Sequence, residues 1–320
     1  MDLITKGETQ LLKGIAIIMV IIEHIGQAFH IGIINPLGPL GVFLFLFLSG
    51  YGLSCSYKKN GVKNYLSNKI IKVYLPYAFT VVLFLIWSLI INTTFSVTTI
   101  ARYFVLLSLP QGSYWYLVLM FYWYIVFYLC SPIYKKIGIL IAFMVVASLL
   151  ITWLEGFSRG YVWQFISFPL GVVVGKYPDK TFKSCTLLKN NLGSWILLIV
   201  AVVLVVFKKT PYVELHELGI VDTALQIGIT LILGVWLILN RSLFEKIRLL
   251  KVSIMFVGAY SYELYLSHVV MLDWLKNSAT IIHLLIYIVI MIASAVLIYL
   301  FSKGIKYTWK KRLIADGGRI

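Results

Sequence analysis

Charged residues are scarce in this chain, and acidic residues are the scarcest. Only 12% of its 320 residues are charged, with 12 Asp and Glu against 28 Lys and Arg, whereas 61% are hydrophobic. Soluble globular domains carry about 25% charged residues, so a composition this poor in charge excludes that class. The sequence instead predicts an all-α, polytopic membrane protein.

Cysteine is also rare, and its rarity excludes two kinds of site. Cys55, Cys130 and Cys185 have unrelated spacings and fall near the ends of apolar segments. Such a pattern indicates neither a disulfide framework nor a cysteine metal site. We therefore expect no bound metal.

The net charge of +16 does not indicate a nucleic-acid partner, because the basic residues are spread over short loops rather than gathered in one patch. Repeats, low-complexity tracts and long polar stretches are also lacking. Residues 1–320 are thus predicted to form a single integral membrane domain, with a basic cytoplasmic tail over 303–320. Any chemistry must then take place within the helical bundle.

Ten apolar segments are each long enough to cross a hydrocarbon core of ~30 Å, allowing for tilt and for a short sixth one. They lie near residues 11–29, 37–57, 73–92, 114–131, 137–154, 161–175, 192–207, 221–239, 252–275 and 281–302. The first has no small-residue cleavage site after it, so we expect it to be retained. The sequence therefore predicts a bundle of ten transmembrane helices.

The basic residues favour one orientation of this bundle. If the N-terminus is cytoplasmic, all but five of the 28 Lys and Arg lie on the inner side, the exceptions being Arg102, Arg159, Lys208, Lys209 and Lys276. Lys and Arg are enriched on the cytoplasmic side of membrane proteins. We therefore predict a multi-pass protein of the cell membrane with both termini in the cytoplasm.

The first apolar segment, LLKGIAIIMVIIEHIGQAF, contains two ionisable residues, Lys13 and His24, on one helical face. Eleven steps of ~100° return the chain to within ~20° of the same face, with the two side chains ~16 Å apart. An ionisable group inside a membrane is costly and by default marks a functional site. His24 is thus the leading catalytic candidate. The alternatives are a neutral histidine bonded to a neighbouring helix and, for Lys13, an ordinary charge at the inner boundary.

A second ionisable group lies at a similar predicted depth. The ninth segment contains SYELYLSH, in which Glu263 lies ~16–20 Å from the inner boundary by helix rise, close to the depth of His24. A carboxylate there can orient or stabilise an imidazole that acts as a general base. Glu23 is adjacent to His24 but ~100° around the helix, so we expect it to meet a different helix.

Two further features lie in the second segment and just before the third. Ser49 and Gly50 interrupt the phenylalanine run of GVFLFLFLSGY, and close helix packing accounts well for Gly50. Lys69 and Lys72 are one helical turn apart at the start of the third segment. They fit interfacial anchors, and a pair on one face also fits phosphate binding.

Taken together, these residues resemble the acyltransferase-3 family of integral membrane acyltransferases, over essentially the whole chain. Five ordered pieces carry the resemblance: Lys13 with His24; Gly41, Phe43, Phe45, Ser49, Gly50 and Tyr51; Lys69 and Lys72 before Tyr74, Pro76 and Tyr77; WYL at 115–117 with FPLGVVVGK at 168–176; and Ser261, Tyr262, Tyr265, Leu266 and His268. Their order along ten segments makes the resemblance specific.

The resemblance implies transfer of an acyl group, usually acetyl from cytoplasmic acetyl-CoA, to a hydroxyl of a cell-surface carbohydrate or lipid-linked glycan. It implies that His24 is catalytic and that basic residues at the inner side bind the phosphates of CoA. These would be Lys13, Lys69 and Lys72, where arginine is commoner in the family. Lysine keeps the charge but loses the bidentate geometry of arginine toward phosphate.

The remaining site residues follow from the same motifs. We expect Glu263 to assist His24 in catalysis. Support of the substrate or of the site is expected from Ser49, Tyr51, Trp115, Tyr265 and His268. An imidazole with an ordinary pKa of about 6.5 suits deprotonation of a hydroxyl at neutral pH. Direct transfer with His24 as base and a transient acyl-histidine both stay open.

Two other functions compete with this interpretation. In a transporter or flippase for a glycan or lipid-linked sugar, His24 and Glu263 would relay protons or bind substrate. Such proteins often have broken helices in matching positions of two halves, and the sequence shows no such correspondence. A membrane scaffold without chemistry is disfavoured by the two intramembrane ionisable residues.

Overall fold

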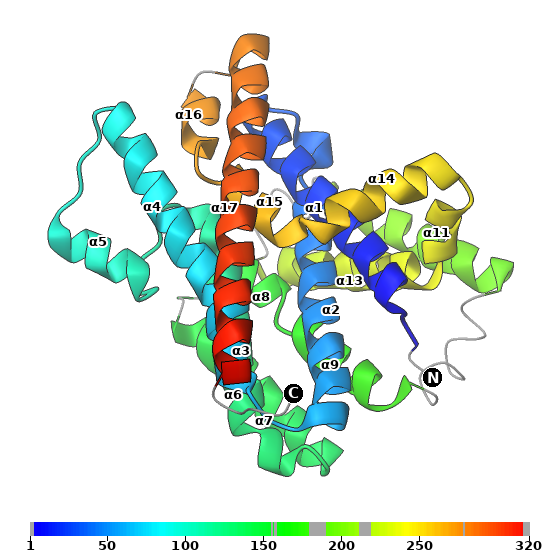
Figure 1. The fold of residues 1–320 in the computed structure, drawn as a ribbon. Coiled ribbons are helices and arrows are strands. Elements are labelled where there is room, and N and C mark those ends of the chain that lie inside the picture. The colour runs from blue at the N-terminus through cyan, green and yellow to red at the C-terminus, as the bar shows by residue number, and fades with distance from the viewer. Residues whose placement is uncertain are drawn as a thin grey trace. The chain divides into compact units, whose positions relative to one another are not determined.

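The computed structural model describes residues 3–154, 156, 159–178, 190–210, 219–277 and 279–315. Within these ranges the chain is helical and has no β-strand, which agrees with the all-α prediction (Figure 1). Its contacts divide into two compact units. The first comprises Met1–Glu23, Ile33–Val62 and Leu119–Ala259, and the second comprises His24–Gly32, Lys63–Val118 and Tyr260–Ile320.

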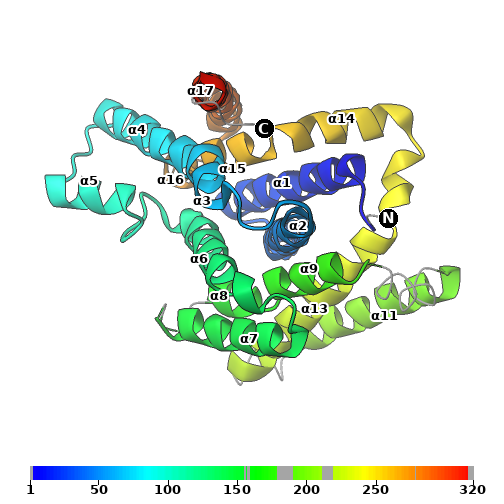
Figure 2. The same ribbon diagram turned by 60° about the horizontal axis from the view of Figure 1, so that its bottom comes forward.

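The first unit contains the larger number of apolar helices. They are most of α1 (Lys6–Ala28), α2 (Leu37–Asn60), most of α6 (Trp115–Leu129), α7 (Ile137–Leu154), α8 (Arg159–Trp163), α9 (Ser167–Lys176), α11 (Asn191–Lys208), α13 (Gly219–Leu239) and α14 (Arg248–Ala259). α2 packs along α9, and α11 packs along α13 (Figure 2). Short 3₁₀ turns, η4 (Ser131–Ile133) and η5 (Arg241–Glu245), follow α6 and α13.

Glycines allow α2 and α9 to approach backbone to backbone. A Cβ atom on Gly50 of α2 would collide with the carbonyl oxygen of Phe168, and one on Gly171 of α9 would collide with that of Phe47. Small residues permit such close helix contacts in membranes, where apolar area alone gives little drive for association. The sequence-based explanation of Gly50 as a packing residue therefore agrees with the structure.

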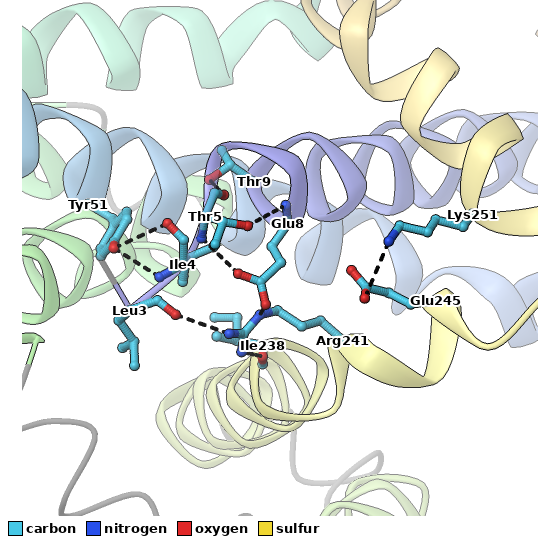
Figure 3. A network of polar contacts seen from close by, with 10 residues as sticks. All are labelled: Leu3, Ile4, Thr5, Glu8, Thr9, Tyr51, Ile238, Arg241, Glu245 and Lys251. Carbon is cyan, nitrogen blue, oxygen red and sulfur yellow. Dashed lines mark hydrogen bonds and ion pairs between the residues drawn. The ribbon is translucent and has the colours of Figure 1, made fainter. Parts of the chain in front are cut away.

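Polar contacts fix the start of α1 (Figure 3). Thr5 and Glu8 form a capping box, in which the backbone N–H of Thr5 donates to Glu8 Oε2 at 2.7 Å and that of Glu8 donates to Thr5 Oγ1 at 3.2 Å. Arg241 donates to Glu8 Oε1 at 2.6 Å and to the carbonyl oxygen of Leu3 at 3.0 Å. The entry to α1 is thus tied to η5, the turn that follows α13.

The second unit surrounds a short polar helix. It contains α3 (Tyr65–Lys69), the π-helical turn η2 (Ile70–Tyr74), α4 (Leu75–Ile90), α5 (Val97–Phe104), η3 (Gly112–Tyr114), α15 (Ser261–His268), α16 (Leu272–Asn277) and α17 (Ile281–Ala315). α15 packs against α17 and α4, and α16 packs against α17. The last residues of α1, from His24 onward, belong to this unit.

The predicted count of ten spans is not confirmed. Among the residues that the structure describes, 7 helices are long and apolar enough to cross a membrane: Lys6–Ala28, Gly32–Asn60, Tyr65–Ile90, Gly112–Leu129, Ile137–Leu154, Gly219–Leu239 and Ile281–Trp309. The segment predicted at 192–207 is an apolar helix of shorter length. The segment predicted at 161–175 consists of the two short helices α8 and α9.

The prediction of one continuous helix over 252–275 is wrong. The chain there forms α14, α15 and α16, with breaks at Tyr260 and between His268 and Leu272. A helix can break inside a membrane protein where other groups satisfy the freed backbone atoms. Tyr287 donates to the carbonyl oxygen of His268 at 2.8 Å and Tyr114 donates to that of Leu266 at 2.8 Å, so both oxygens are paired. Hydropathy does not reveal such pairing, because the partners lie elsewhere in the sequence.

Candidate active site

His24 lies four residues before the end of α1, and its side chain is partly exposed. Because α1 is one unbroken helix from Lys6 to Ala28, the predicted placement of Lys13 and His24 on a single helix is confirmed. At a rise of ~1.5 Å per residue, the two residues are therefore ~16 Å apart along the helix axis.

A second histidine lies beside His24. The ring of His268, at the end of α15, lies with its centroid 5.2 Å from that of His24, and the two planes are inclined by 33°. His268 is 0% exposed. The site thus contains one imidazole that is partly buried and one that is fully enclosed.

The orientation of His268 is set by its own helix. Its Nδ1 atom lies 2.6 Å from the carbonyl oxygen of Tyr265, and because a carbonyl oxygen only accepts, Nδ1 donates in this hydrogen bond. The Nε2 atom is buried and has no hydrogen-bond partner among the residues described. Such orphaned buried atoms are uncommon in folded proteins and require an explanation.

Gln27 and Lys276 complete the surroundings of His24. Gln27 Oε1 lies 3.4 Å from His24 Nδ1 and accepts a hydrogen bond from Lys276 Nζ at 3.1 Å. The sequence analysis missed both as site residues. Gln27 follows His24 by three positions and therefore lies on the same helical face, a signal that was available. Lys276 belongs to α16, and sequence spacing gives no signal for its approach.

Tyr265 ties the end of α15 to the start of α6. Its hydroxyl donates to the carbonyl oxygen of Ser113 at 2.9 Å, and its ring lies 5.0 Å from that of Tyr116 and 5.1 Å from that of His268. Trp115, the first residue of α6, lies between Ser113 and Tyr116 in the sequence. Its side chain is partly buried. The structure therefore brings together two of the predicted supporting residues, His268 and Tyr265.

Glu263 is buried, with 8% of its surface exposed, in the first turn of α15. Its predicted depth assumed a continuous helix from residue 252, and the break at Tyr260 removes the basis for that estimate. The neighbour that the structure gives for His24 is His268 at the other end of α15. Assistance of His24 by Glu263 stays a prediction.

The three lysines predicted to bind CoA fall in different units. Lys13 is a partly buried residue of the first unit. Lys69 ends α3 in the second unit, with its Nζ 5.6 Å from the centroid of the Tyr65 ring, and Lys72 is exposed in η2. The π-helical turn changes the expected spacing, because its hydrogen bonds span five residues rather than four. Lys69 and Lys72 are therefore not separated by one regular α-helical turn.

The remaining predicted positions lie in the first unit. Ser49 shares a side-chain hydrogen bond with Tyr124, and the hydroxyl of Tyr51 accepts from the backbone N–H of Ile4 at 3.0 Å. Glu23 is buried, and its carboxylate contacts Gly38 of α2. This contact agrees with the expectation that Glu23 meets a helix other than its own.

The described residues thus form apolar helices long enough to cross a membrane, with two neighbouring imidazoles near a break between helices. The comparison with known families identifies the class further. Residues 8–303 match the model of the acyltransferase-3 family, which is described as an acyltransferase domain. The chain belongs to this family and is a membrane acyltransferase. Comparisons with curated proteins and with solved structures gave no match.

Proposed function

We propose that the protein moves an acyl group from cytoplasmic acyl-CoA to a hydroxyl of a cell-surface or lipid-linked carbohydrate, with acetyl as the first candidate for that group. The observation that carries the proposal is the partly exposed His24 beside the enclosed His268 in a chain of the acyltransferase-3 family. Acyl transfer to a hydroxyl needs a base that can reach substrate, and an imidazole that is not fully enclosed meets this need. The enzyme would act in the cell membrane with both termini in the cytoplasm.

In the proposed reaction, His24 removes the proton of the acceptor hydroxyl through its unprotonated ring nitrogen. The hydroxyl oxygen forms a bond with the carbonyl carbon of the thioester, and the carbon–sulfur bond breaks. The imidazolium then returns the proton to the departing thiolate, which leaves as free CoA. A variant of this sequence first moves the acyl group to a nitrogen of His24, and the hydroxyl attacks that acyl-histidine in a second step.

The donor part of the proposal rests on the sequence motifs alone, in which Lys13, Lys69 and Lys72 bind the phosphates of CoA. Along α1, Lys13 and His24 are ~16 Å apart, a distance of the same order as an extended pantetheine arm. Burial of the reaction away from water would protect the thioester from hydrolysis. Assistance by Glu263 and support by Ser49, Tyr51, Trp115 and Tyr265 are further parts of this proposal.

The experiment that tests the function uses inside-out membrane vesicles from the native cells, with the gene replaced by each variant. Incubation with acetyl-CoA labelled in the acetyl group should place label in a surface glycan. His24→Ala should abolish the transfer, whereas His30→Asn, a change at an exposed histidine, should leave it intact. Undiminished labelling by a folded His24→Ala protein would contradict the mechanism, and movement of glycan without label would favour the transporter.

The donor site is tested separately by changing Lys13, Lys69 and Lys72 together to Gln. Loss of three charges near the CoA phosphates should raise the KM for acetyl-CoA by about tenfold or more, since hydrogen bonds to charged groups contribute about 1.5–3 kcal/mol each. The kcat should change little, because in this proposal the lysines bind the phosphates of CoA and not the reacting carbonyl. An unaltered KM would identify the three residues as topological anchors.

A further inference from the structure

The side chain of Gln27 lies between an imidazole and an ammonium group. Its Oε1 atom is 3.4 Å from His24 Nδ1 and 3.1 Å from Lys276 Nζ. All three residues belong to the second unit. One amide oxygen at the end of α1 thus contacts both the candidate base and a cation that comes from α16.

The ammonium determines the orientation of the Gln27 amide. A lysine ammonium has donors and no acceptor, so the atom that it contacts is the amide oxygen. A reversed amide would place its NH₂ group against the ammonium, with donors facing donors. Lys276 therefore selects the orientation in which Gln27 offers an acceptor to His24.

This orientation of the amide also determines the tautomer of His24. An amide oxygen only accepts hydrogen bonds, so His24 Nδ1 donates to Gln27 Oε1 and carries a proton. The reaction proposed above begins with a neutral ring, and the like charge of Lys276 nearby favours that form. A neutral imidazole with its proton at Nδ1 has its lone pair at Nε2. Nε2 is then the nitrogen that can take a proton from substrate.

The packing of α16 holds Lys276 in position. Leu272 and Leu275 of this helix are both 0% exposed. The ring of Trp274 lies 4.7 Å from that of His283 in α17, the helix against which α16 packs. The ammonium of Lys276 therefore extends from a fixed helix toward the end of α1.

The charge of Lys276 is balanced by no carboxylate in the described part of the chain, where Gln27 is its hydrogen-bond partner. Lys208 provides a comparison, because it also donates to a glutamine, Gln226 at 2.6 Å, but forms an ion pair with Asp222 at 3.3 Å as well. A partly buried cation without such a pair is costly, and in a membrane protein it marks a functional site by default. The contact with Gln27 is the task that the structure gives to Lys276.

We propose that Gln27, oriented by Lys276, is the positioning residue of His24: its amide oxygen accepts the Nδ1–H of His24 and thereby makes Nε2 the nitrogen that acts as the base. The inference rests on the proposed function, in which His24 removes the proton of the acceptor hydroxyl. A general base is usually oriented by a third group that accepts its other N–H. Gln27 takes the orienting task that the sequence suggested for Glu263.

The hydrogen bond between His24 and Gln27 strengthens during the reaction. Nε2 takes the hydroxyl proton while the hydroxyl oxygen bonds to the thioester carbon, and the ring becomes an imidazolium whose Nδ1–H···O bond is charge-assisted. When the carbon–sulfur bond breaks, Nε2 returns the proton to the departing thiolate. Catalytic hydrogen bonds are often long in the free enzyme and tighten when substrate is bound, which agrees with the distance of 3.4 Å.

Two substitutions of Gln27 separate this role from a structural one. Gln27→Glu keeps an oxygen acceptor for both His24 and Lys276 and loses the amide N–H donors. Gln27→Leu has a similar volume and loses the acceptor. A role in packing predicts that leucine is the better replacement, because it adds no charge to a partly buried position. The positioning role predicts that glutamate is the better one.

The kinetic test measures acetyl transfer from labelled acetyl-CoA in the vesicles described above, with each variant as the full chain. Gln27→Leu should lower kcat about 10²-fold with an unchanged KM for acetyl-CoA, since general-base catalysis contributes about 10²–10⁴-fold. Gln27→Glu should retain activity within about tenfold of the wild type, because its oxygen still accepts the Nδ1–H. Equal activity of Gln27→Leu and the wild type, or a Leu variant more active than the Glu variant, would overturn the proposal.

A spectroscopic test observes the tautomer directly. In protein labelled with ¹⁵N at its 5 histidines, the imidazole shifts at a pH where the rings are neutral distinguish Nδ1–H from Nε2–H, and loss of one signal in His24→Gln assigns His24. The wild type and Gln27→Glu should carry the proton of His24 at Nδ1, and Gln27→Leu should raise the Nε2–H share. A wild-type His24 with its proton at Nε2, or a tautomer that Gln27→Leu leaves unchanged, refutes the proposal.

The part assigned to Lys276 is tested with Gln27 left in place. Lys276→Met removes the donor that orients the amide, so the Nε2–H share of His24 should rise, whereas Lys276→Arg keeps a donor and should preserve the wild-type tautomer. Lys303→Met, at an exposed lysine of α17, is the matched control. An unchanged tautomer in Lys276→Met would overturn the orienting role of Lys276.

These experiments keep the inference separate from the proposed function. Full transfer by His24→Ala would reject His24 as the base and with it the role of Gln27. Loss of transfer in His24→Ala together with full transfer in Gln27→Leu would reject the positioning role alone. The tautomer measurements need neither acyl donor nor acceptor, so they test the hydrogen bond to Gln27 whatever the substrate proves to be.

Discussion

The contact between α2 and α9 in the first unit and the short helix α15 in the second are both buried, yet different forces hold them. α2 and α9 meet through glycines, with Gly50 and Gly171 each against a carbonyl group of the other helix. α15 is held by tyrosine hydroxyls that donate to backbone oxygens, from Tyr114 to Leu266 and from Tyr287 to His268. The first contact depends on shape, and the second depends on hydrogen bonds.

This difference matches what each region has to do. Close packing of regular helices gives rigidity but leaves no polar group available for chemistry. A broken helix frees backbone carbonyls, and the tyrosines that pair with them fix the position of the side chains nearby. The polar residues Ser261, Glu263, Ser267 and His268 of α15 are thereby kept in a buried position. The scaffold and the candidate site are thus built by different means.

The largest effect is expected from overfilling the α2–α9 contact. Gly50→Ala places a methyl group against the carbonyl oxygen of Phe168 and should lower the free energy of unfolding by about 1–3 kcal/mol, the usual result of overpacking. The measurement is the midpoint of thermal unfolding in detergent. Gly52→Ala on the same helix is the control, because its Cβ would meet no atom within 4 Å. Equal midpoints for the two variants would show that shape does not hold this contact.

A smaller loss of stability, with a larger loss of activity, is expected from Tyr287→Phe. The substitution leaves the buried carbonyl oxygen of His268 without its 2.8 Å partner, at about 1–2 kcal/mol, while the ring is retained. Because that carbonyl fixes the end of α15, acetyl transfer should fall by about tenfold even at temperatures where the protein stays folded. Tyr299→Phe, at the partly exposed partner of Tyr260 in α17, is the matched control. Unchanged transfer by Tyr287→Phe would mean that this bond does not position the site.

The smallest effect is expected at the entry to α1. Arg241→Gln removes the donors to Glu8 and Leu3 and should cost about 1 kcal/mol, because the pair is only partly screened by solvent. Lys251→Gln breaks the more exposed ion pair with Glu245, 3.4 Å long, and should change the midpoint of unfolding hardly at all. Neither should affect acetyl transfer in the vesicle assay. If Lys251→Gln proved the more destabilising of the two, the anchoring role of Arg241 would be rejected.

Hydropathy predicted α2, α7 and α13 of the first unit well because each is a nearly uninterrupted apolar run. α2, α7 and α13 begin and end within a few residues of the predicted 37–57, 137–154 and 221–239. The same criterion failed at 252–275, where the average stays apolar although the helix breaks twice. At this break the hydroxyls of Tyr114 and Tyr287 donate hydrogen bonds to backbone oxygens of α15. Local hydropathy does not predict these bonds, because both tyrosines are distant in the sequence.

The candidate site was predictable in its residues but not in its pairing. His24 was evident because an ionisable side chain stands out in an apolar helix, and His268 belonged to a motif. The contact between their rings depends on the fold of the second unit, and the sequence had suggested Glu263 as the partner instead. Gln27 could have been predicted from helical periodicity, because it follows His24 by three residues. Lys276 could not, because its approach to Gln27 depends on how the chain folds after His268.

The length of α17 has a consequence for the end of the chain. Its 35 residues extend for ~52 Å, about 20 Å more than the hydrocarbon core of a bilayer. Lys303 and Lys306 are therefore carried on a stiff helical extension rather than on a flexible tail. Anionic headgroups attract such cations at about 1 kcal/mol each. The same continuous helix packs against α4, α15 and α16, so it joins these cations to the helices around the candidate site.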